Sequence, residues 1–157
     1  TLNTADRSVE TLDTALRRSF TFEEVMPEPE LLRNIEFEGF NLGVVLGTLN
    51  NRIEALLDRD HTIGHYYFLN IESGNKSALK QAFENKIIPL LQEYFYHDYD
   101  KIALILGEGF IKYKQSTLNF ANVKNLEKPE LNDSFELKKI DDIEDAIMIL
   151  LNNKDEE

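Results

Sequence analysis

The sequence predicts a mainly α-helical protein with a minor amount of β-structure, and three observations support this class. Apolar residues recur at helical spacing over residues 42–57, 79–94 and 143–151. Segments typical of strands are short and lie at residues 20–25 and 110–113. The chain has 157 residues, of which 42% are hydrophobic, so it holds enough apolar material for one compact core and too little for two.

The first expected elements are a helix over residues 8–18 and a strand over residues 20–25. The helix carries three apolar residues at helical spacing, Val9, Leu12 and Leu16. The strand is rich in aromatic and β-branched residues, and two prolines within residues 26–29 end it. This double proline is the clearest boundary in the chain, and we expect a mostly helical region after it.

A long helix is expected over residues 42–57. Its apolar stripe contains Leu42, Val45, Leu46, Leu49, Ile53, Leu56 and Leu57. Four polar residues are placed largely on the opposite face: Asn50, Asn51, Arg52 and Glu54. A loop over residues 58–64 should follow this helix and lead into the aromatic residues 66–69.

A second apolar stripe predicts another helix over residues 79–94, with a kink or break at Pro89. The stripe contains Leu79, Phe83, Ile87, Leu90, Leu91 and Tyr94. Residues 102–106 can continue as a helix until Gly107 and Gly109 stop it.

The remaining elements are expected to be a strand, a loop and a final helix. Residues 110–113 alternate like a strand, and the polar residues 125–133 are interpreted as a loop. Asp141 and Glu144 resemble a capping pair for an amphipathic helix that ends before the acidic C-terminal residues.

Composition narrows the classes of function. A net charge of -12 without a visible basic cluster argues against direct DNA binding by this chain. No apolar run approaches the length of about 18 residues that a membrane helix needs, and the absence of cysteine excludes disulfides and thiolate metal sites. We therefore expect a soluble cytoplasmic protein. Because Thr1 is not preceded by methionine or a signal-like leader, we expect the chain to be part of a longer protein.

Four blocks in order resemble the McrB family of AAA+ nucleoside triphosphatases. The blocks are residues 1–8 (TLNTADRS), 13–20 (DxALRRxF), 60–68 (DHxIGHxYF) and 85–95 (NKIIPLLQEYF). The resemblance implies that residues 1–27 are the end of an α/β nucleotide-binding core, opening at its sensor 1 strand, and that residues 28–157 are a helical lid subdomain with a C-terminal extension.

The same resemblance implies that the Walker A and Walker B segments lie upstream of this chain. The chain has no glycine-rich loop followed by Lys and Ser or Thr, which would hold the phosphates and Mg²⁺. We therefore expect no hydrolysis by this fragment alone and no cofactor bound to it. In the intact protein the resemblance implies GTP or ATP with Mg²⁺, and suggests GTP over ATP.

Four residues near the start of the chain are candidates for nucleotide contacts. Asn3 stands where the family places sensor 1, which positions the γ-phosphate or the attacking water. Thr4 and Asp6 match the segment proposed to recognise guanine, since a carboxylate can accept two hydrogens from a base edge. The alternatives are a turn or cap asparagine and an N-cap aspartate. Arg7 can serve the same sites or face solvent.

Arg17 and Arg18 match the position of the family's arginine finger, a cationic side chain that reaches the γ-phosphate bound by a neighbouring subunit. Ser19 stands where the family often has a third arginine, so either of the two arginines can act, and Arg18 is preferred. On spacing alone, both would be cations at a helix C-terminus. The finger requires an oligomer, which the resemblance implies is a homo-oligomeric ring.

His61 and His65 are four residues apart and lie near Asp58 and Asp60, which raises the possibility of a metal site. Thr62 and Gly64 argue against the helix that this site would need. The family resemblance favours a loop between lid and nucleotide, in which His65 orders the turn, and we predict no metal.

The implied function involves partner proteins, and two other functions are also possible for this sequence. The resemblance implies a motor subunit of a 5-methylcytosine-specific restriction system that works with a separate nuclease subunit of the McrC type and reaches DNA through other domains. One alternative is a non-enzymatic helical module that docks a partner protein. Another is the lid of an AAA+ ATPase that remodels proteins.

Overall fold

The computed structural model describes residues 29–152. Within this range the protein is mainly helical with two small antiparallel strand pairs, as the sequence predicts. The expected helix over residues 8–18 and the strand over residues 20–25 lie outside the described residues. The boundary drawn after residue 27 therefore stays a prediction.

Helix α2 (Leu42–Leu56) confirms most of the first long stripe and forms one wall of the core. Leu57, which was predicted in the stripe, follows the helix as its C-cap and is exposed. It begins where the side chain of Asn41 accepts a hydrogen bond from the backbone N–H of Val44 at 3.0 Å, a standard N-cap. A 3-10 turn, η1 (Pro29–Leu32), and a small hairpin of β1 (Glu36–Phe37) and β2 (Phe40–Asn41) precede it. Two-residue strands have no sequence periodicity, so the hairpin was not predicted.

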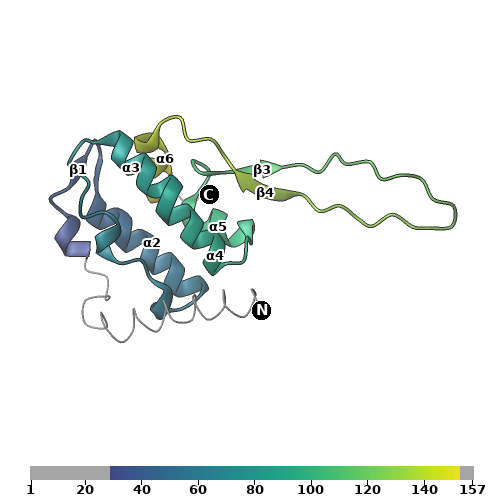
Figure 1. Ribbon diagram of the computed structural model, residues 1–157, viewed down its shortest axis with the longest axis horizontal. Helices are drawn as coiled ribbons and strands as arrows, with labels where there is room; N and C mark the ends of the chain where they lie inside the picture. The colour runs from purple at the N-terminus through teal and green to yellow at the C-terminus, as the bar shows by residue number, and fades with distance from the viewer. Residues whose placement is uncertain (1–28, 153–157) are drawn as a thin grey trace, which may run out of the picture.

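The second stripe forms one continuous helical rod with a π-turn in its middle (Figure 1). The rod consists of α3 (Lys76–Ala82), η4 (Phe83–Ile87) and α4 (Ile88–Tyr94). The N–H of Ile88 bonds to the carbonyl of Phe83, five residues earlier, and Pro89 follows without an N–H. The extra residue rotates the stripe. The predicted core positions Leu90 and Tyr94 are consequently only half-buried.

The remaining helices close the core. Helix α5 (Tyr99–Leu106) ends at Gly107, whose φ of +81° requires glycine. Helix α6 (Ile143–Leu151) is present as predicted, but its N-cap is Asp142, which accepts from the N–H of Asp145. The capping role predicted for Asp141 was wrong by one residue.

Aromatic rings bring the helices together at the centre. The ring of Phe83 stacks on that of Phe110 with centroids 5.0 Å apart and lies 5.9 Å from that of Phe68. All three side chains are fully buried. Residues far apart in the sequence thus form the single core that the composition predicts.

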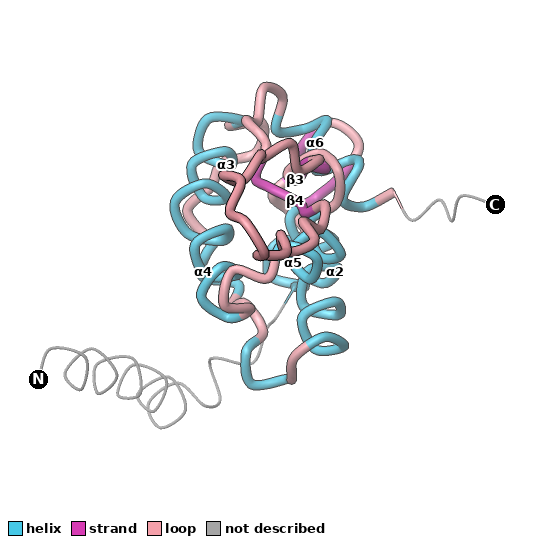
Figure 2. Tube along the Cα trace, turned by 90° about the vertical axis from the view of Figure 1, so that its right-hand side faces the viewer, coloured by secondary structure: helices cyan, strands magenta, loops and turns pink. Residues whose placement is uncertain are grey.

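An extended arm, residues 111–137, projects from this helical body (Figure 1). It consists of β3 (Ile111–Lys114), β4 (Ser134–Leu137) and the loop over residues 115–133. The strands are antiparallel and pair Ile111 with Leu137 and Lys114 with Ser134. Figure 2 looks down the arm and shows it leaving the body between the helices. The predicted strand and loop are confirmed, whereas β4 was not predicted.

No helix in residues 29–152 is long and apolar enough to cross a membrane.

Candidate functional site

The structure describes one of the seven predicted site residues, His65. Asn3, Thr4, Asp6, Arg7, Arg17 and Arg18 lie outside the described residues. The site is therefore built around residues 58–67, which we call the His65 loop. It joins the end of α2 to the rest of the core and consists of two 3-10 turns, η2 (Arg59–His61) and η3 (His65–Tyr67).

The first turn is held by Asp58, whose side chain caps it. Its Oδ1 accepts the backbone N–H of His61 at 2.9 Å and lies 2.6 Å from the Nδ1 of the same histidine. Burial raises the pKa of the Asp58 carboxyl, but the hydrogen bonds and charge of His61 together outweigh it, so the pKa lies below the ordinary value. The carboxylate thus orders the start of the loop in its charged form.

Asn50 clamps the middle of the loop from helix α2. Its amide nitrogen donates to the carbonyl of Ile63 at 2.8 Å, and its amide oxygen accepts the N–H of Ile63 at 2.5 Å. The side chain is buried, with 6% exposure. Both backbone groups of one buried loop residue are satisfied by one amide, which fixes the path of the loop.

Asn50 corrects the sequence analysis, which placed it on the polar face of the helix. The spacing held the information: Asn50 follows Leu46 by four residues and precedes Ile53 by three, which places it within the apolar stripe. Arg52 is also not simply solvated, because its Nη1 donates to the carbonyl of Ile105 on α5 at 2.8 Å. Burial lowers the pKa of this guanidinium.

His65 opens the second turn, directly after Gly64. A Cβ on Gly64 would lie 2.2 Å from the Tyr66 ring, so any other residue would require this exposed ring to move. The rings of Tyr66 and Tyr67 stack with centroids 4.8 Å apart. The Nδ1 atom of His65 is buried and has no hydrogen-bond partner among the described residues. A buried polar atom of this kind calls for a partner.

The two histidines of the loop do not share a helical face. Thr62 and Gly64 are extended, with ψ of 151° each, and separate the two short turns. In residues 29–152, no three His, Asp or Glu side chains gather closely enough to hold a metal ion. His61 is instead engaged by Asp58, as described above.

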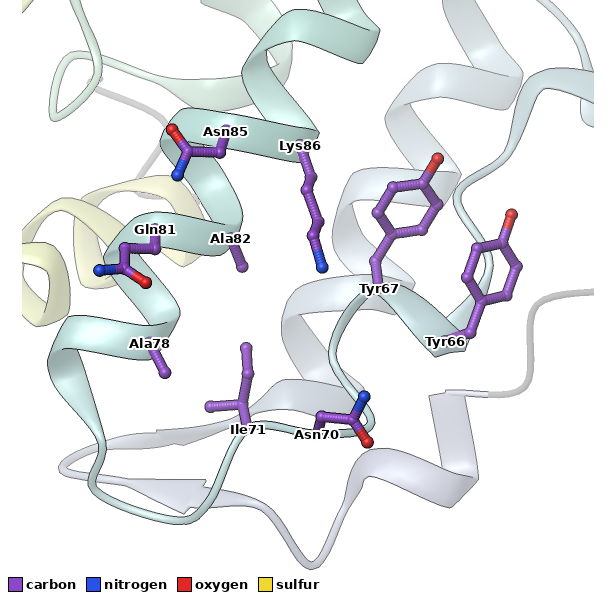
Figure 3. A pocket seen from close by; sticks show the side chains of 9 residues that line it. All are labelled: Tyr66, Tyr67, Asn70, Ile71, Ala78, Gln81, Ala82, Asn85 and Lys86. Carbon is purple, nitrogen blue, oxygen red and sulfur yellow. The ribbon is translucent and has the colours of Figure 1, made fainter.

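A pocket of about 250 Å³ opens beside the His65 loop (Figure 3). It lies between η3 with the turn after it and the rod of α3 and η4. Its lining combines two aromatic rings, several amides and one cation: Tyr66, Tyr67, Asn70, Ile71, Ala78, Gln81, Ala82, Asn85 and Lys86. The side chain of Lys86 points into the space between the rod and Tyr67. Such a lining can receive polar or anionic groups.

Part of this chain is similar to proteins of a known family. Residues 41–103 match the family model described as the alpha-helical lid domain of McrB. The chain is also 34% identical, over 113 residues, to the "Type IV methyl-directed restriction enzyme EcoKMcrB subunit" of Escherichia coli (strain K12). Residues 41–103 form an McrB-type lid domain. The match to the relative covers 62% of this chain and 25% of the relative, so the chain spans about a quarter of that protein's length.

The McrB-type lid contains every feature of the site described above. Helix α2, the His65 loop, the pocket and the rod all fall within residues 41–103. The arm and α6 follow the matched segment. Asn50 and the His65 loop are therefore parts of the lid itself, and the arm is an addition beyond the family match.

Proposed function

We propose that this chain is the lid-bearing C-terminal part of an AAA+ nucleoside triphosphatase that serves as the motor subunit of a DNA restriction complex. The observation that carries the proposal is the match of residues 41–103 to the McrB lid. The relative's role as a subunit of a methyl-directed restriction enzyme supports the choice of system. The proposed fuel is GTP in preference to ATP, with Mg²⁺ held by upstream segments.

In this proposal the lid closes over nucleotide bound to the core. Asn3 contacts the γ-phosphate or the attacking water, and Thr4, Asp6 and Arg7 line the base and its surroundings. The buried, unpartnered Nδ1 of His65 supports a role for the His65 loop at this boundary, because it offers one hydrogen bond to nucleotide or core. Asn50 is a positioning residue, since it holds the loop without leaving the core.

Between subunits, Arg18 acts as the arginine finger of the neighbouring site in a homo-oligomeric ring, with Arg17 as its alternative. A planar guanidinium there stabilises the charge that develops on the transferring phosphoryl group. Hydrolysis around the ring drives DNA translocation, and a separate nuclease subunit of the McrC type cuts. Contact with DNA is made through other domains.

The test uses the full-length protein that carries this chain. Replacing Arg18 with alanine should lower GTP hydrolysis at least about a hundredfold, because finger arginines contribute on the order of 10³ to 10⁵ in rate. Arg17→Ala is the matched comparison and should have the smaller effect. Mixing the Arg18→Ala protein with subunits defective only in nucleotide binding should restore part of the activity, since each supplies what the other lacks.

Four outcomes would overturn parts of this proposal. An undiminished rate in both arginine variants would exclude the finger, and a full-length protein that hydrolyses neither GTP nor ATP would favour a non-enzymatic interaction module. Competition in which ATP displaces GTP from the intact motor would favour an ATP-driven remodelling protein. Sustained phosphate release by residues 1–157 alone would show that the Walker segments are not required.

A further inference from the structure

The arm, residues 111–137, is the least buried part of the described chain. Every residue from Thr117 to Ser134 is exposed. The loop of residues 115–133 contains no helix or strand, and loops of this length inside a compact domain are usually functional or disordered. Local bonds give it shape: Tyr113 and the N–H of Ser116 both donate to Asp133, and Lys128 Nζ donates to Asn122 at 2.7 Å.

The exposed arm carries large apolar side chains. Five of them lie in its loop: Leu118, Phe120, Val123, Leu126 and Leu131. Leu126, at the tip, is 67% exposed. A segment that serves only as a solvated linker is polar, whereas exposed apolar groups gathered on a projection mark an interaction surface. The arm extends away from its own helical body, so that body does not cover them (Figure 1).

The charge of the arm favours a protein over a nucleic acid. Residues 111–137 contain four lysines and four acidic residues, so the arm has no net charge. Lys112 and Lys114 are both paired with Glu136, at 3.3 and 3.6 Å. A phosphate backbone is held by an excess of cations, which the arm lacks.

The tip of the arm is complementary in charge to the rest of the chain. Residues 117–128 contain two lysines and one glutamate, a net charge of +1. The helical body, residues 29–110 and 138–152, contains 16 acidic and nine basic residues, a net charge of -7. Two such acidic bodies repel each other, and an apolar, slightly basic tip is the part best suited to bridge them.

The arm is also long enough to reach across a neighbouring copy of the helical body. Half of its 27 residues, at about 3.3 Å each, can reach up to roughly 40 Å. A helical body of about 100 residues has a radius of gyration near 13 Å, so the arm can cross most of a neighbour. A contact between an arm on one copy and a body on the next is heterologous, and repetition of such a contact gives a ring when the rotation between copies closes.

We propose that the arm docks on the helical body of a second copy of this chain, with Leu118, Val123 and Leu126 in the contact and Lys124 facing the acidic surface. We choose a second copy as the partner because the proposed function, on which this choice rests, places several copies of the chain in one ring. The apolar, neutral character of the arm does not depend on that ring.

Photo-crosslinking in the full-length protein tests this contact. Leu126→p-benzoylphenylalanine is introduced in subunits of natural isotope content, which are mixed with ¹⁵N-labelled subunits. Mass spectrometry should find adducts that join a light arm to heavy peptides from residues 29–110 or 138–152. Adducts confined to one chain, adducts only to added DNA or to a nuclease subunit, or no adducts in assembled oligomers would each overturn the proposal.

A second measurement uses variants that leave the core untouched. The triple replacement Leu118→Ser, Val123→Ser and Leu126→Ser should raise the concentration needed for oligomers in sedimentation experiments at least about tenfold, because the apolar area of three side chains would no longer be buried in the contact. Asn119→Ser, in the same segment, is the control and should have no effect. An unchanged concentration in the triple variant would contradict the contact.

The two proposals fail in different ways. If Arg18→Ala abolishes GTP hydrolysis but the triple arm variant forms oligomers normally, the arm contact is wrong and the proposed motor function stands. If light-to-heavy adducts form but the full-length protein does not hydrolyse nucleotide, the motor function is wrong and the arm contact stands.

Discussion

The helical body and the arm of this protein are built on opposite principles. In the body, apolar side chains from every helix meet in one core, and Phe68, Phe83 and Phe110 are fully buried. In the arm, a four-residue strand pair is the only regular structure, and residues 117–134 are all exposed. One chain thus combines a helical body that buries its own core with a segment whose apolar groups are exposed.

The largest expected effect is a difference in the free energy of unfolding between alanine replacements of two phenylalanines, one in the body and one in the arm. Phe83→Ala should lower the free energy of unfolding by about 3–5 kcal/mol, because it empties the space between two other rings. Phe120→Ala, in the arm, should change it by less than about 0.5 kcal/mol. Urea unfolding followed by circular dichroism measures both. Similar losses would mean that the arm belongs to the folding unit.

Proteolysis should distinguish the two regions next. Trypsin should cut after Lys124 on the order of a hundredfold faster than after Lys101, which is also exposed but lies on helix α5. A helix must open locally before cleavage, whereas the loop needs no such step. Timed digestion with mass spectrometry gives the ratio. Docking on a second copy should reduce it as the protein concentration rises.

The third-largest effect is expected from loss of the Asn50 hydrogen bonds that join α2 to the His65 loop. Asn50→Leu removes two hydrogen bonds and leaves the N–H and carbonyl of Ile63 unsatisfied, at a cost of about 2 kcal/mol. Asn51→Leu, its exposed neighbour, is the matched control and should stay within about 0.5 kcal/mol. Hydrogen exchange at the Ile63 amide should speed up in the first variant alone. Equal exchange in both would refute the clamp.

The smallest effect concerns the cap of the first turn in the loop. Asp58→Asn keeps a capping oxygen but removes the charge beside His61, so it should lower stability at neutral pH by about 0.2–1 kcal/mol, the range of exposed ion pairs. Because the folded-state pKa of Asp58 is depressed, its contribution is complete above the ordinary aspartate pKa of about 3.9 and is lost as the pH falls through the folded value.

The pH dependence of this cap has its own control. The stability difference between the natural chain and Asp58→Asn should shrink on acidification from pH 6 to pH 3. Glu54→Gln, an exposed replacement on α2 that also removes one negative charge, is the matched comparison. A difference that grows toward low pH would contradict the depressed pKa.

Much of the body could be predicted because its information is local. The stripes over residues 42–57, 79–94 and 143–151 correspond to α2, the rod of α3, η4 and α4, and α6. The errors came from effects that spacing alone does not report. The π-turn inserted a residue and moved Leu90 and Tyr94 partly out of the core, and Asp142 rather than Asp141 capped the last helix.

The candidate site could be predicted only in part. Family resemblance pointed to His65, and the structure adds its buried Nδ1, the Asp58 cap and the Asn50 clamp. Asn50 was misplaced because a polar residue was assigned to the polar face, although its spacing put it within the stripe. The roles of Asn3, Thr4, Asp6, Arg7, Arg17 and Arg18 stay predictions, since these residues lie outside the described part.

By itself, the sequence determined which segments become helices and that they share one core, because apolar periodicity acts over a few residues along the chain. Only the tertiary structure decided that Asn50 reaches Ile63, that Phe110 stacks on Phe83, and that residues 111–137 pair into an arm. These contacts join positions 13 or more residues apart, where chain geometry and packing, rather than local preference, select the partner.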